Sequence, residues 1–296
     1  MTGYRVEKFT ELLPYFEAAH AEYLSEFHMN GKRRKGVRAY TLYTNSPLPC
    51  MEERLAFILS YLKLNPIQEA HADLFDIEQK QCCQLIHGLR EILYQALEAT
   101  ASVPAQSDAQ LQEVLSGRTS EEEKILLHDG TEREVPRPQD EVEQASKYSG
   151  KKKRHTLKNA VLINCCCLVL YVSPTFAGRV HDKKIADVSY CIPQGFTLAQ
   201  DTGYQGYRPD GVRIVQPVKK PRGKELTEEQ KQNNRIISSF RVRVEHAIGS
   251  IKRYRTVKDE CRLRKNLFVE RVFILCAALH NFRIKDKPFT YENKLT

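Results

Sequence analysis

Two acidic residues in this chain each follow a short apolar run and precede a glycine by one or two positions. Asp129 stands in KILLHDGTEREV (124–135), and Asp201 stands in FTLAQDTGYQGY (196–207). A single carboxylate of this kind can cap a turn, but two that lie close together repel each other unless a cation lies between them. Hard divalent ions such as Mg²⁺ take oxygen ligands and keep waters and phosphate oxygens in their other positions. The pair therefore predicts a cation site, provided that the two strands are neighbours.

A third carboxylate, Glu245, lies in a helical pattern farther along the chain, SSFRVRVEHAIGSIKRYR (238–255). The apolar stripe of this helix is formed by Ile237, Val244, Ile248 and Ile251. Arg241, Glu245 and Lys252 fall together along its edge. Glu245 can form an ordinary intrahelical pair with Arg241. With the two aspartates it can instead complete a site for two ions about 3.5–4 Å apart, an arrangement that cleaves and transfers phosphodiesters, and the set of three favours this interpretation.

The runs around these residues predict an α/β domain, a mixed sheet flanked by helices. Strands are expected at 124–129, 155–164, 168–173, 196–201 and 213–219, a helix at about 181–190, and further helices from 227 to about 283. The first and fourth of these strands end on Asp129 and Asp201. As neighbours in the sheet they would bring the two carboxylates together.

The first hundred residues predict a small all-α domain. Leu55, Ile58, Leu59 and Leu62 recur at helical spacing in a helix that ends at Asn65 and Pro66, a short helix follows at 67–75, and Asp76 is expected to cap a long helix at about 77–97. This succession is typical of a helix-turn-helix, whose last helix enters the major groove of DNA. The polar side chains that would face bases or phosphates are Glu78, Gln79, Lys80, Gln81 and Gln84. The alternative is a plain helical bundle with a solvated polar face.

The charge distribution indicates a polyanionic partner. The net charge is +9, and sixteen basic residues stand against seven acidic ones between residues 204 and 264. A second basic tract, KYSGKKKRHTLK, spans 147–158, and a third, GKRRKGVR at 31–38, is a candidate phosphate-tracking arm ahead of the helix-turn-helix. Any one tract alone would suggest only a solvated face, but together they favour nucleic acid.

Composition and patterning set the domain organisation. The 296 residues contain no apolar run of eighteen that could span a bilayer, and no signal peptide is expected. Nine cysteines without a C-x-x-C motif are expected to be reduced core residues of a cytoplasmic protein. We expect a helical DNA-binding domain at 1–98, a linker with one helical turn at 99–120, a catalytic domain at 121–286 and a C-terminal tail at 287–296.

Seven segments between Ile125 and Arg283 resemble a known family. They are HDGTEREVPRP, YSGKKKRHTLKN, GRVHDKKIAD, QDTGYQGY, KKPRGKELTEEQKQNNRIIS, RVRVEHAIGSIKRYR and LCAALHNFR, in that order. Together they resemble the DDE transposases of bacterial insertion sequences, in the branch related to the eukaryotic Harbinger-like nucleases, over more than half of the chain. The resemblance implies an RNase H-like catalytic domain preceded by a helix-turn-helix, and it assigns the metal-binding triad to Asp129, Asp201 and Glu245.

The resemblance also implies a mechanism with two divalent ions, Mg²⁺ or Mn²⁺. Such ions activate a water, and later a DNA 3′-hydroxyl, for in-line attack on a phosphodiester, and they stabilise the leaving oxygen. We expect Asp201 to bridge both ions, with Asp129 and Glu245 each completing the coordination of one.

Two basic residues of the same helix match positions of related insertion-sequence enzymes. Arg241 and Lys252 correspond to the arginine and lysine that flank the glutamate there, and the lysine approaches DNA near the transposon end. We expect both residues to bind DNA. In that motif a tyrosine usually stands three residues before the arginine. This chain has Ser238 instead, so the tyrosine's role does not transfer.

Several other residues of the matched segments carry two interpretations. Lys151, Lys152, Lys153 and Arg154, at a predicted hairpin tip, either contact phosphates or are merely solvated. Asp182, which follows His181, is either a cap of the next helix or a ligand, and the cap is favoured. For Tyr204, Tyr207, His280 and Asn281, packing in the core is favoured over a role toward DNA.

Three functions are compatible with these features. The chain is a transposase that binds terminal inverted repeats and cuts and joins DNA, a related endonuclease that cuts without joining, or a domesticated DNA-binding protein. The intact triad and basic tracts count against the third. Expected partners are double-stranded DNA, at transposon ends and target, and further copies of the chain, because two ends must be cut together. The expected location is the bacterial cytoplasm, at the nucleoid and without membrane association.

Overall fold

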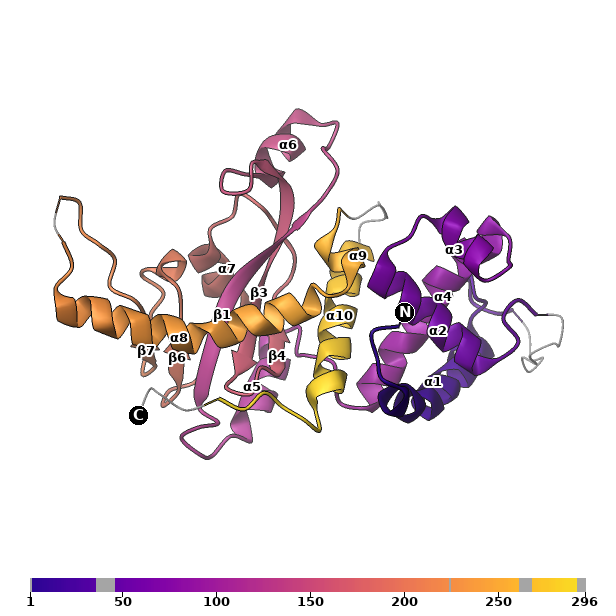
Figure 1. The fold of residues 1–296 in the computed structure, drawn as a ribbon, viewed down its shortest axis with the longest axis horizontal. Coiled ribbons are helices and arrows are strands. Elements are labelled where there is room, and N and C mark those ends of the chain that lie inside the picture. The colour runs from indigo at the N-terminus through magenta and orange to yellow at the C-terminus, as the bar shows by residue number, and fades with distance from the viewer. Residues whose placement is uncertain (1, 36–45, 224, 261–267, 292–296) are drawn as a thin grey trace. The chain divides into compact units, whose positions relative to one another are not determined.

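The computed structural model describes residues 2–35, 46–223, 225–260 and 268–291 (Figure 1). The chain divides into two compact units. The helical unit comprises Met1–Val103, Arg253–Asp259 and Leu275–Arg283, and the sheet unit comprises Pro104–Lys252, Glu260–Ile274 and Ile284–Thr296. Within the described residues, no helix is both long and apolar enough to cross a membrane.

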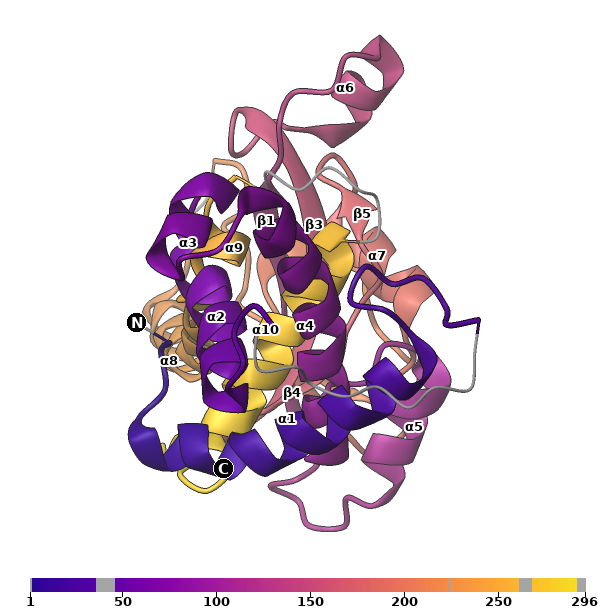
Figure 2. The ribbon, with the colours of Figure 1, turned by 90° about the vertical axis from the view of Figure 1, so that its right-hand side faces the viewer.

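The helical unit is built around one long helix. Its elements are α1 (Val6–Glu26), α2 (Met51–Leu64), α3 (Gln68–Leu74), α4 (Gln79–Ala99) and the short α9 (Arg255–Lys258). Helices α1, α2 and α3 pack on α4 (Figure 2), and α9 packs on α2. The predicted end of α2 is confirmed: Asn65 adopts the left-handed conformation, with φ of 49°, and Pro66 cannot continue the helix.

Sequence patterning did not predict α1. Its buried face includes Leu12, Phe16, Ala19 and Tyr23, which recur at helical spacing, but Pro14 lies inside the helix and argues against one. Tertiary packing overrides that local preference. The buried Arg54 of α2 ties the two helices together, because its guanidinium donates to the His20 ring at 2.7 Å.

The start of α4 differs from the prediction. Asp76 does not cap it: this residue lies in the turn after α3 with φ of 51°, a conformation that aspartate tolerates better than most residues. The cap residue is Glu78, whose backbone N–H donates to the Gln81 side chain at 3.1 Å. The long helix therefore begins at Gln79, two residues later than expected, and Gln81 is partly engaged in capping.

The sheet unit contains a mixed sheet, as predicted. Its strands are β1 (Ile125–Glu134), β2 (Tyr148–Ser149), β3 (Arg154–Asn164), β4 (Val169–Val172), β5 (Phe176–Ala177), β6 (Thr197–Ala199) and β7 (Arg213–Val215). They are ordered β2-β3-β1-β6-β7, and β4 and β5 also pair with β3. β1 runs antiparallel to β3 but parallel to β6, which in turn runs parallel to β7. The predicted adjacency of the first and fourth strands of the sequence pattern is therefore confirmed.

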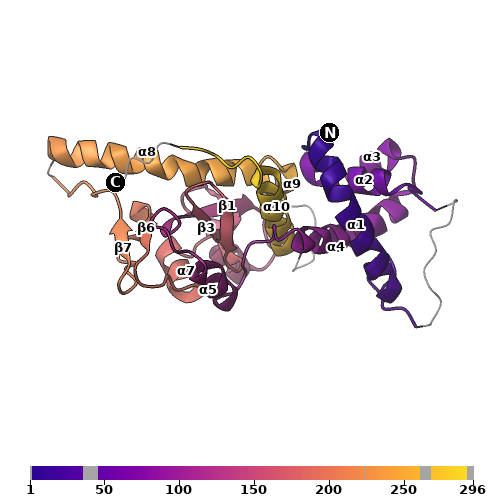
Figure 3. The same cartoon turned by 90° about the horizontal axis from the view of Figure 1, so that it is seen from below.

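Helices cover both faces of this sheet. α8 (Glu228–Ile251) runs along one face, whereas α5 (Asp108–Ser116) and α7 (Asp182–Ser189) lie on the opposite face (Figure 3). α6 (Glu141–Lys147) stands in the connection from β1 to β2, and α10 (Phe268–Ile284) follows α9. A core between the sheet and α5 and α7 contains Leu126, Leu162 and Leu198 from the strands.

Residues 99–120, expected as a linker with one helical turn, contain the nine-residue helix α5. The hydroxyl of Ser107 caps it by accepting from the Gln110 backbone N–H. Leu111 is fully buried and Leu115 almost so, and both belong to the core of the sheet unit. Sequence patterning did not predict this helix because its amphipathic pattern spans only nine residues and is flanked by small polar residues.

The cysteines within the described residues form no disulfide, and they are not all core residues. Cys82, Cys165, Cys167 and Cys276 are buried. Cys50 and Cys191 are exposed, contrary to the prediction. Cys261 lies outside the described residues.

Candidate active site and DNA-binding residues

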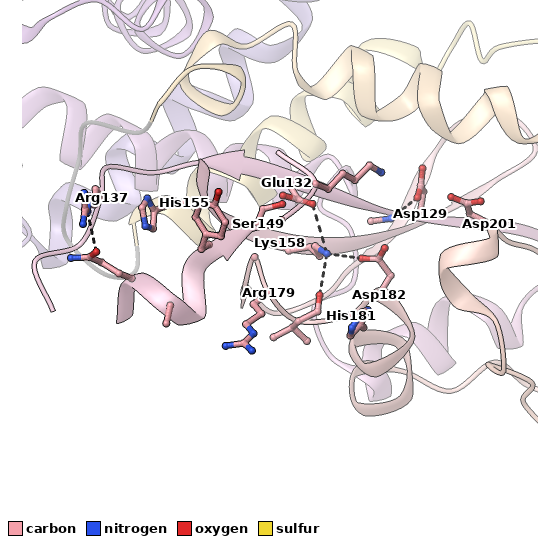
Figure 4. Close-up of a pocket in the computed structure, with 18 of the residues that line it drawn as sticks. Asp129, Glu132, Arg137, Ser149, His155, Lys158, Arg179, His181, Asp182 and Asp201 are labelled. Atoms are coloured by element: carbon pink, nitrogen blue, oxygen red, sulfur yellow. Dashed lines mark hydrogen bonds and ion pairs between the residues drawn. The ribbon is translucent and has the colours of Figure 1, made fainter. Parts of the chain in front are cut away.

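The backbone register of two parallel strands brings Asp129 and Asp201 together. The last parallel pair between β1 and β6 is Leu127 with Ala199. Each aspartate lies two residues beyond its member of this pair, so both side chains return to the same face of the sheet. Figure 4 shows the two carboxylates next to each other.

Asp129 is not the last residue of its strand, contrary to the prediction. β1 continues to Glu134 because its antiparallel pairing with β3 continues, with Asp129 opposite Val161. The pairing with β6 stops at Leu127, so at the level of the aspartate β1 has a strand partner on one side only among the residues that the structure describes. Asp201 lies where β6 has ended and precedes a 3₁₀ turn, Thr202–Tyr204.

Arg241 of α8 contacts both aspartates. Its Nη2 lies 3.8 Å from Asp129 Oδ2, and its Nη1 lies 3.7 Å from Asp201 Oδ1. The arginine side chain is only 10% exposed. Arg241, which we expect to bind DNA, thus also provides the counter-charge of the two carboxylates, and its positive charge lies between α8 and the sheet.

Local hydrogen bonds orient both carboxylates. The Gly130 backbone N–H donates to Asp129 Oδ1 at 2.8 Å, and the Thr202 backbone N–H donates to Asp201 Oδ1. Burial, together with the nearby Asp201, raises the pKa of Asp129 to about 6, against the opposing effects of Arg241 and the Gly130 N–H. An acid with a raised pKa beside a second acid is an environment in which a cation is favourable.

Glu245 is exposed and lies one turn after Arg241 on α8. It lines the same cleft as the aspartates, a hollow of about 1280 Å³. Among the residues that the structure describes, no three His, Cys, Asp or Glu side chains are arranged so that they could hold a metal ion together. The structure therefore pairs Asp129 with Asp201 and places Glu245 on the wall of their cleft, without closing a three-carboxylate cluster.

The donor chemistry of the cleft suits a hard divalent ion. Carboxylate oxygens are the ligands that Mg²⁺ and Mn²⁺ prefer. Besides the two aspartates, Asp182 lines the cleft, and its Oδ1 is buried without a hydrogen-bond partner in the described part of the chain. Asp129 and Asp201 are the carboxylates that such an ion would meet together, and Asp182 and Glu245 line the same cleft.

Asp182 is not the cap of α7, which corrects the favoured interpretation. The cap position belongs to His181, and Asp182 is the first residue of the helix. Its Oδ1 lies 3.1 Å from Lys158 Nζ, an ion pair without hydrogen-bond alignment. Lys158 also lies 3.8 Å from Glu132 and donates to the Val180 carbonyl at 3.0 Å (Figure 4).

The other basic residues predicted to bind DNA differ in exposure. Lys151, Lys152, Lys153 and Arg154 form the exposed tip of the β2–β3 hairpin, and Arg154 pairs with Glu134 at 2.8 Å. Lys252 follows the last turn of α8 and donates to the Glu132 carbonyl at 2.9 Å. Burial lowers the pKa of Lys252.

In the helical unit, the predicted recognition residues also differ. Gln79 and Lys80 are exposed at the start of α4, whereas Gln81 and Gln84 are half-buried and line a smaller cleft of about 420 Å³ with the segment around Met29. Of the basic arm at 31–38, residues 36–38 lie outside the described residues.

Sequence reasoning missed a buried polar group behind the aspartates. His128 and Gln200, the residues immediately before Asp129 and Asp201, face the opposite side of the sheet and hydrogen-bond to each other at 3.2 Å. The His128 ring also hydrogen-bonds to the Tyr190 hydroxyl and stacks on Tyr204 at 3.9 Å between ring centroids. Burial lowers the pKa of His128 to about 3. The sequence offered one signal for this group: successive residues of a strand face opposite sides of the sheet, so His128 and Gln200 must face away from the aspartates that follow them.

The core interpretation is confirmed for four aromatic and polar residues. Tyr204 and Tyr207 are buried, as are His280 and Asn281. Asn281 donates to the Ser102 carbonyl at 3.0 Å within the helical unit.

Comparison with known proteins identifies the class to which this fold and this cleft belong. Residues 128–281 match the family described as DDE superfamily endonuclease, and the chain belongs to that family. Residues 46–99 match the helix-turn-helix of DDE superfamily endonucleases, which agrees with α2 to α4. The predicted resemblance to DDE transposases with an N-terminal helix-turn-helix is confirmed, and such families imply DNA binding.

Two relatives carry transposase names. The "Probable transposase for insertion sequence element IS702" of Microchaete diplosiphon is 29% identical over 167 residues, which cover 56% of this chain and 59% of that protein, less than two thirds of its length. The "Putative transposase for insertion sequence element IS112" of Streptomyces albus G is 25% identical over 257 residues, 85% of this chain and 87% of the relative. No solved structure matches the chain.

Proposed function

We propose that this chain is a DNA transposase that binds the terminal inverted repeats of an insertion sequence and performs divalent-metal-dependent strand cleavage and strand transfer. The observation that carries the proposal is the shared register of Asp129 and Asp201, two residues beyond the last β1–β6 pair, with Arg241 contacting both. A pair of carboxylates fixed by strand register is suited to bind cations that contact a phosphodiester.

Asp129, Asp201 and Glu245 are the proposed catalytic and metal-binding residues. DDE superfamily endonucleases generally use divalent metal ions, and two Mg²⁺ or Mn²⁺ ions would supply activation of the attacking oxygen and stabilisation of the leaving oxygen. Asp201, at the end of β6, would hold both ions, and Asp129 of β1 and Glu245 of α8 would each hold one. Arg241, which contacts both aspartates, would contact DNA phosphate.

The remaining residues bind and orient DNA. Gln79, Lys80, Gln81 and Gln84 at the start of α4 read the repeat, and the exposed side chains of Gln79 and Lys80 support this assignment most directly. Lys151, Lys152, Lys153 and Arg154, with Lys252, contact phosphates near the cleft. Two copies act together on two ends, at the nucleoid in the cytoplasm.

The sheet supports an RNase H-like assignment of the catalytic domain. Along the order β3-β1-β6-β7, β1 pairs antiparallel with β3 and parallel with β6, and β4 pairs antiparallel with β3. Helix α7 lies in the crossover that precedes β6. We propose residues 1–98 as the helical DNA-binding domain, 121–286 as the catalytic domain and 287–296 as a C-terminal tail. Residues 99–120 connect the two domains and contribute α5 to the core of the sheet unit.

The test is cleavage of a labelled duplex that carries the element's own terminal repeat, with Mg²⁺ or Mn²⁺. Wild type should nick at the repeat boundary and join the freed end to a target plasmid. Asp201→Ala should abolish both steps and leave repeat binding, measured by fluorescence anisotropy, nearly unchanged. The exposed Asp210→Ala is the matched control and should cleave normally.

Other outcomes would select the other two functions. Cleavage by wild type without joining would indicate an endonuclease. Repeat binding without cleavage under either ion would indicate a domesticated DNA-binding protein, and cleavage by Asp201→Ala would remove Asp201 from the site.

A further inference from the structure

Two glycines of the cleft, Gly130 and Gly203, lie next to the carboxylate of Asp182. The Asp182 carboxylate lies against the backbone of β1 next to Asp129 and against the 3₁₀ turn that follows Asp201. A Cβ placed on Gly130, next to Asp129, would stand 2.7 Å from Asp182 Oδ1, and one placed on Gly203 would stand 3.3 Å from Asp182 Oδ2. The absence of side chains at these two positions leaves room for the Asp182 carboxylate beside the two aspartates.

The charge of Asp182 is balanced from the wall of the cleft. Lys158, whose side chain is 10% exposed, lies 3.1 Å from Asp182 Oδ1. The ammonium hydrogen-bonds instead to the Val180 carbonyl, so Asp182 Oδ1 stays buried without a hydrogen-bond partner in the described residues. A buried carboxylate oxygen that has an ion pair but no hydrogen bond can still accept a hydrogen bond from a water or interact with a cation.

We propose that Asp182 is an additional carboxylate of the cation site, a positioning residue that acts through the waters that a divalent ion retains, and that Lys158 balances its charge before the ion binds. The inference rests on the proposed function, because it needs a cation between Asp129 and Asp201. Mg²⁺ and Mn²⁺ keep several waters in protein sites. Acidic groups that accept from such waters tune metal affinity without direct ligation.

The experiment measures Mn²⁺ binding to the full chain without DNA, by isothermal titration and by electron paramagnetic resonance of free Mn²⁺. Asp182→Asn should weaken binding about tenfold, the lower end of the effect of second-layer groups on metal affinity. Gly130→Ala should weaken it in the same direction, because its methyl group displaces the carboxylate without changing any charge. Combining the two should cost no more than Asp182→Asn alone, since both act on the same carboxylate.

Lys158→Met gives a prediction of opposite sign. Removing the ammonium should tighten Mn²⁺ binding, because a competing positive charge is lost. The matched control is the exposed pair on the same helix, Lys183 with Asp187 at 2.6 Å: neither Lys183→Gln nor Asp187→Asn should change the affinity. Circular dichroism melts establish that every variant is folded at the temperature of the titration.

If Asp182 has only a structural role at the start of α7, Asp182→Asn should have a lower melting temperature than wild type. Both Asp182→Asn and Gly130→Ala should then bind Mn²⁺ with the wild-type affinity, and that result would overturn the inference. That result would leave the proposed function standing if Asp129→Asn and Asp201→Asn still lose the ion. Failure of wild type to bind Mn²⁺, or binding that is indifferent to Asp129→Asn and Asp201→Asn, would overturn both.

Discussion

Asp129 and Asp201 lie at the same level of two parallel strands, each two residues past the last paired position, Leu127 with Ala199. Neither position depends on the conformation of a long loop. The strands hold two negative charges close together, and the positive charge of Arg241, on α8, partly neutralises them. This arrangement has a cost in stability that can be measured without any DNA.

Replacing Asp129 by Asn should stabilise the chain at neutral pH in the absence of divalent ions. Burial raises the pKa of this carboxyl from 3.8 to about 6. The folded state therefore favours the protonated form, whose stabilising effect is complete below pH 3.8 and is lost as the pH rises through 6. The shift corresponds to about 2–3 kcal/mol at pH 7.5.

Urea denaturation of wild type and Asp129→Asn at pH 4 and pH 7.5 measures this difference. The two proteins should be nearly equal at pH 4, and the variant should be the more stable at pH 7.5. Asp210→Asn, at an exposed position, is the control and should follow wild type at both values. Equal stability of wild type and Asp129→Asn at pH 7.5 would contradict the raised pKa of Asp129 in the folded state.

Three buried histidines should make stability fall on mild acidification. Burial lowers the pKa of His128 to about 3 and those of His20 and His71 to about 4. The unfolded chain takes up these protons near pH 6.5 while the folded chain does not. Stability is therefore complete above pH 6.5 and decreases below it, by up to about 1.4 kcal/mol per pH unit for each histidine.

Denaturation of wild type and His128→Gln between pH 7.5 and 5 tests the part that belongs to His128. The variant is less stable throughout, but its stability should fall less steeply as the pH decreases. Parallel curves for the two proteins would show that His128 takes up its proton in the folded state.

The Tyr190 hydroxyl should stabilise the sheet unit through its hydrogen bond to the His128 ring. Tyr190→Phe leaves a ring nitrogen buried without a partner, at a cost of about 1–3 kcal/mol. Tyr148→Phe removes a hydroxyl from a side chain that is 42% exposed and should change stability little. Chemical denaturation compares the two variants, and equal effects would mean that the buried hydrogen bond contributes nothing.

The helix in residues 99–120 should behave as part of the core. Leu111→Ala should destabilise the sheet unit by about 2–5 kcal/mol, because the leucine is fully buried. Val114→Ala, on the same helix but 40% exposed, is the control and should cost much less. A thermal melt distinguishes them, and tolerance of Leu111→Ala would return this segment to the linker that the sequence suggested.

The tip of the β2–β3 hairpin should contribute to DNA affinity without reading sequence. Lys151→Gln combined with Lys152→Gln should lower the salt dependence of binding, as the slope of log affinity against log salt, by about 2, because each lost phosphate contact removes roughly 0.9. Lys231→Gln should not, since Lys231 is paired with Glu228 at 2.7 Å. An unchanged slope in the hairpin variant would show that the tip is only solvated.

The sequence was most informative where a pattern is local. The runs that became β3, β4 and α7 were predicted within one or two residues, and the two aspartates were assigned to neighbouring strands. The length of β1 was not predicted, because the strand is extended by its pairing with β3, twenty to forty residues away in the chain, and does not end at the glycine after Asp129. Asp182 was misread for the same reason: only the fold brings Lys158 and Gly130 to its carboxylate.

The one-sided pairing of β1 beyond Leu127 has a consequence for how this chain tolerates changes in length. The aspartates are positioned by counting residues along two strands, so insertions in the connection between β1 and β3 or after Tyr204 leave their spacing untouched. A single residue inserted between Leu127 and Asp129 would reverse the alternation and turn the carboxylate toward the His128 side. The relative position of the two aspartates is thus resistant to large insertions in the loops and sensitive to a single insertion in the strand.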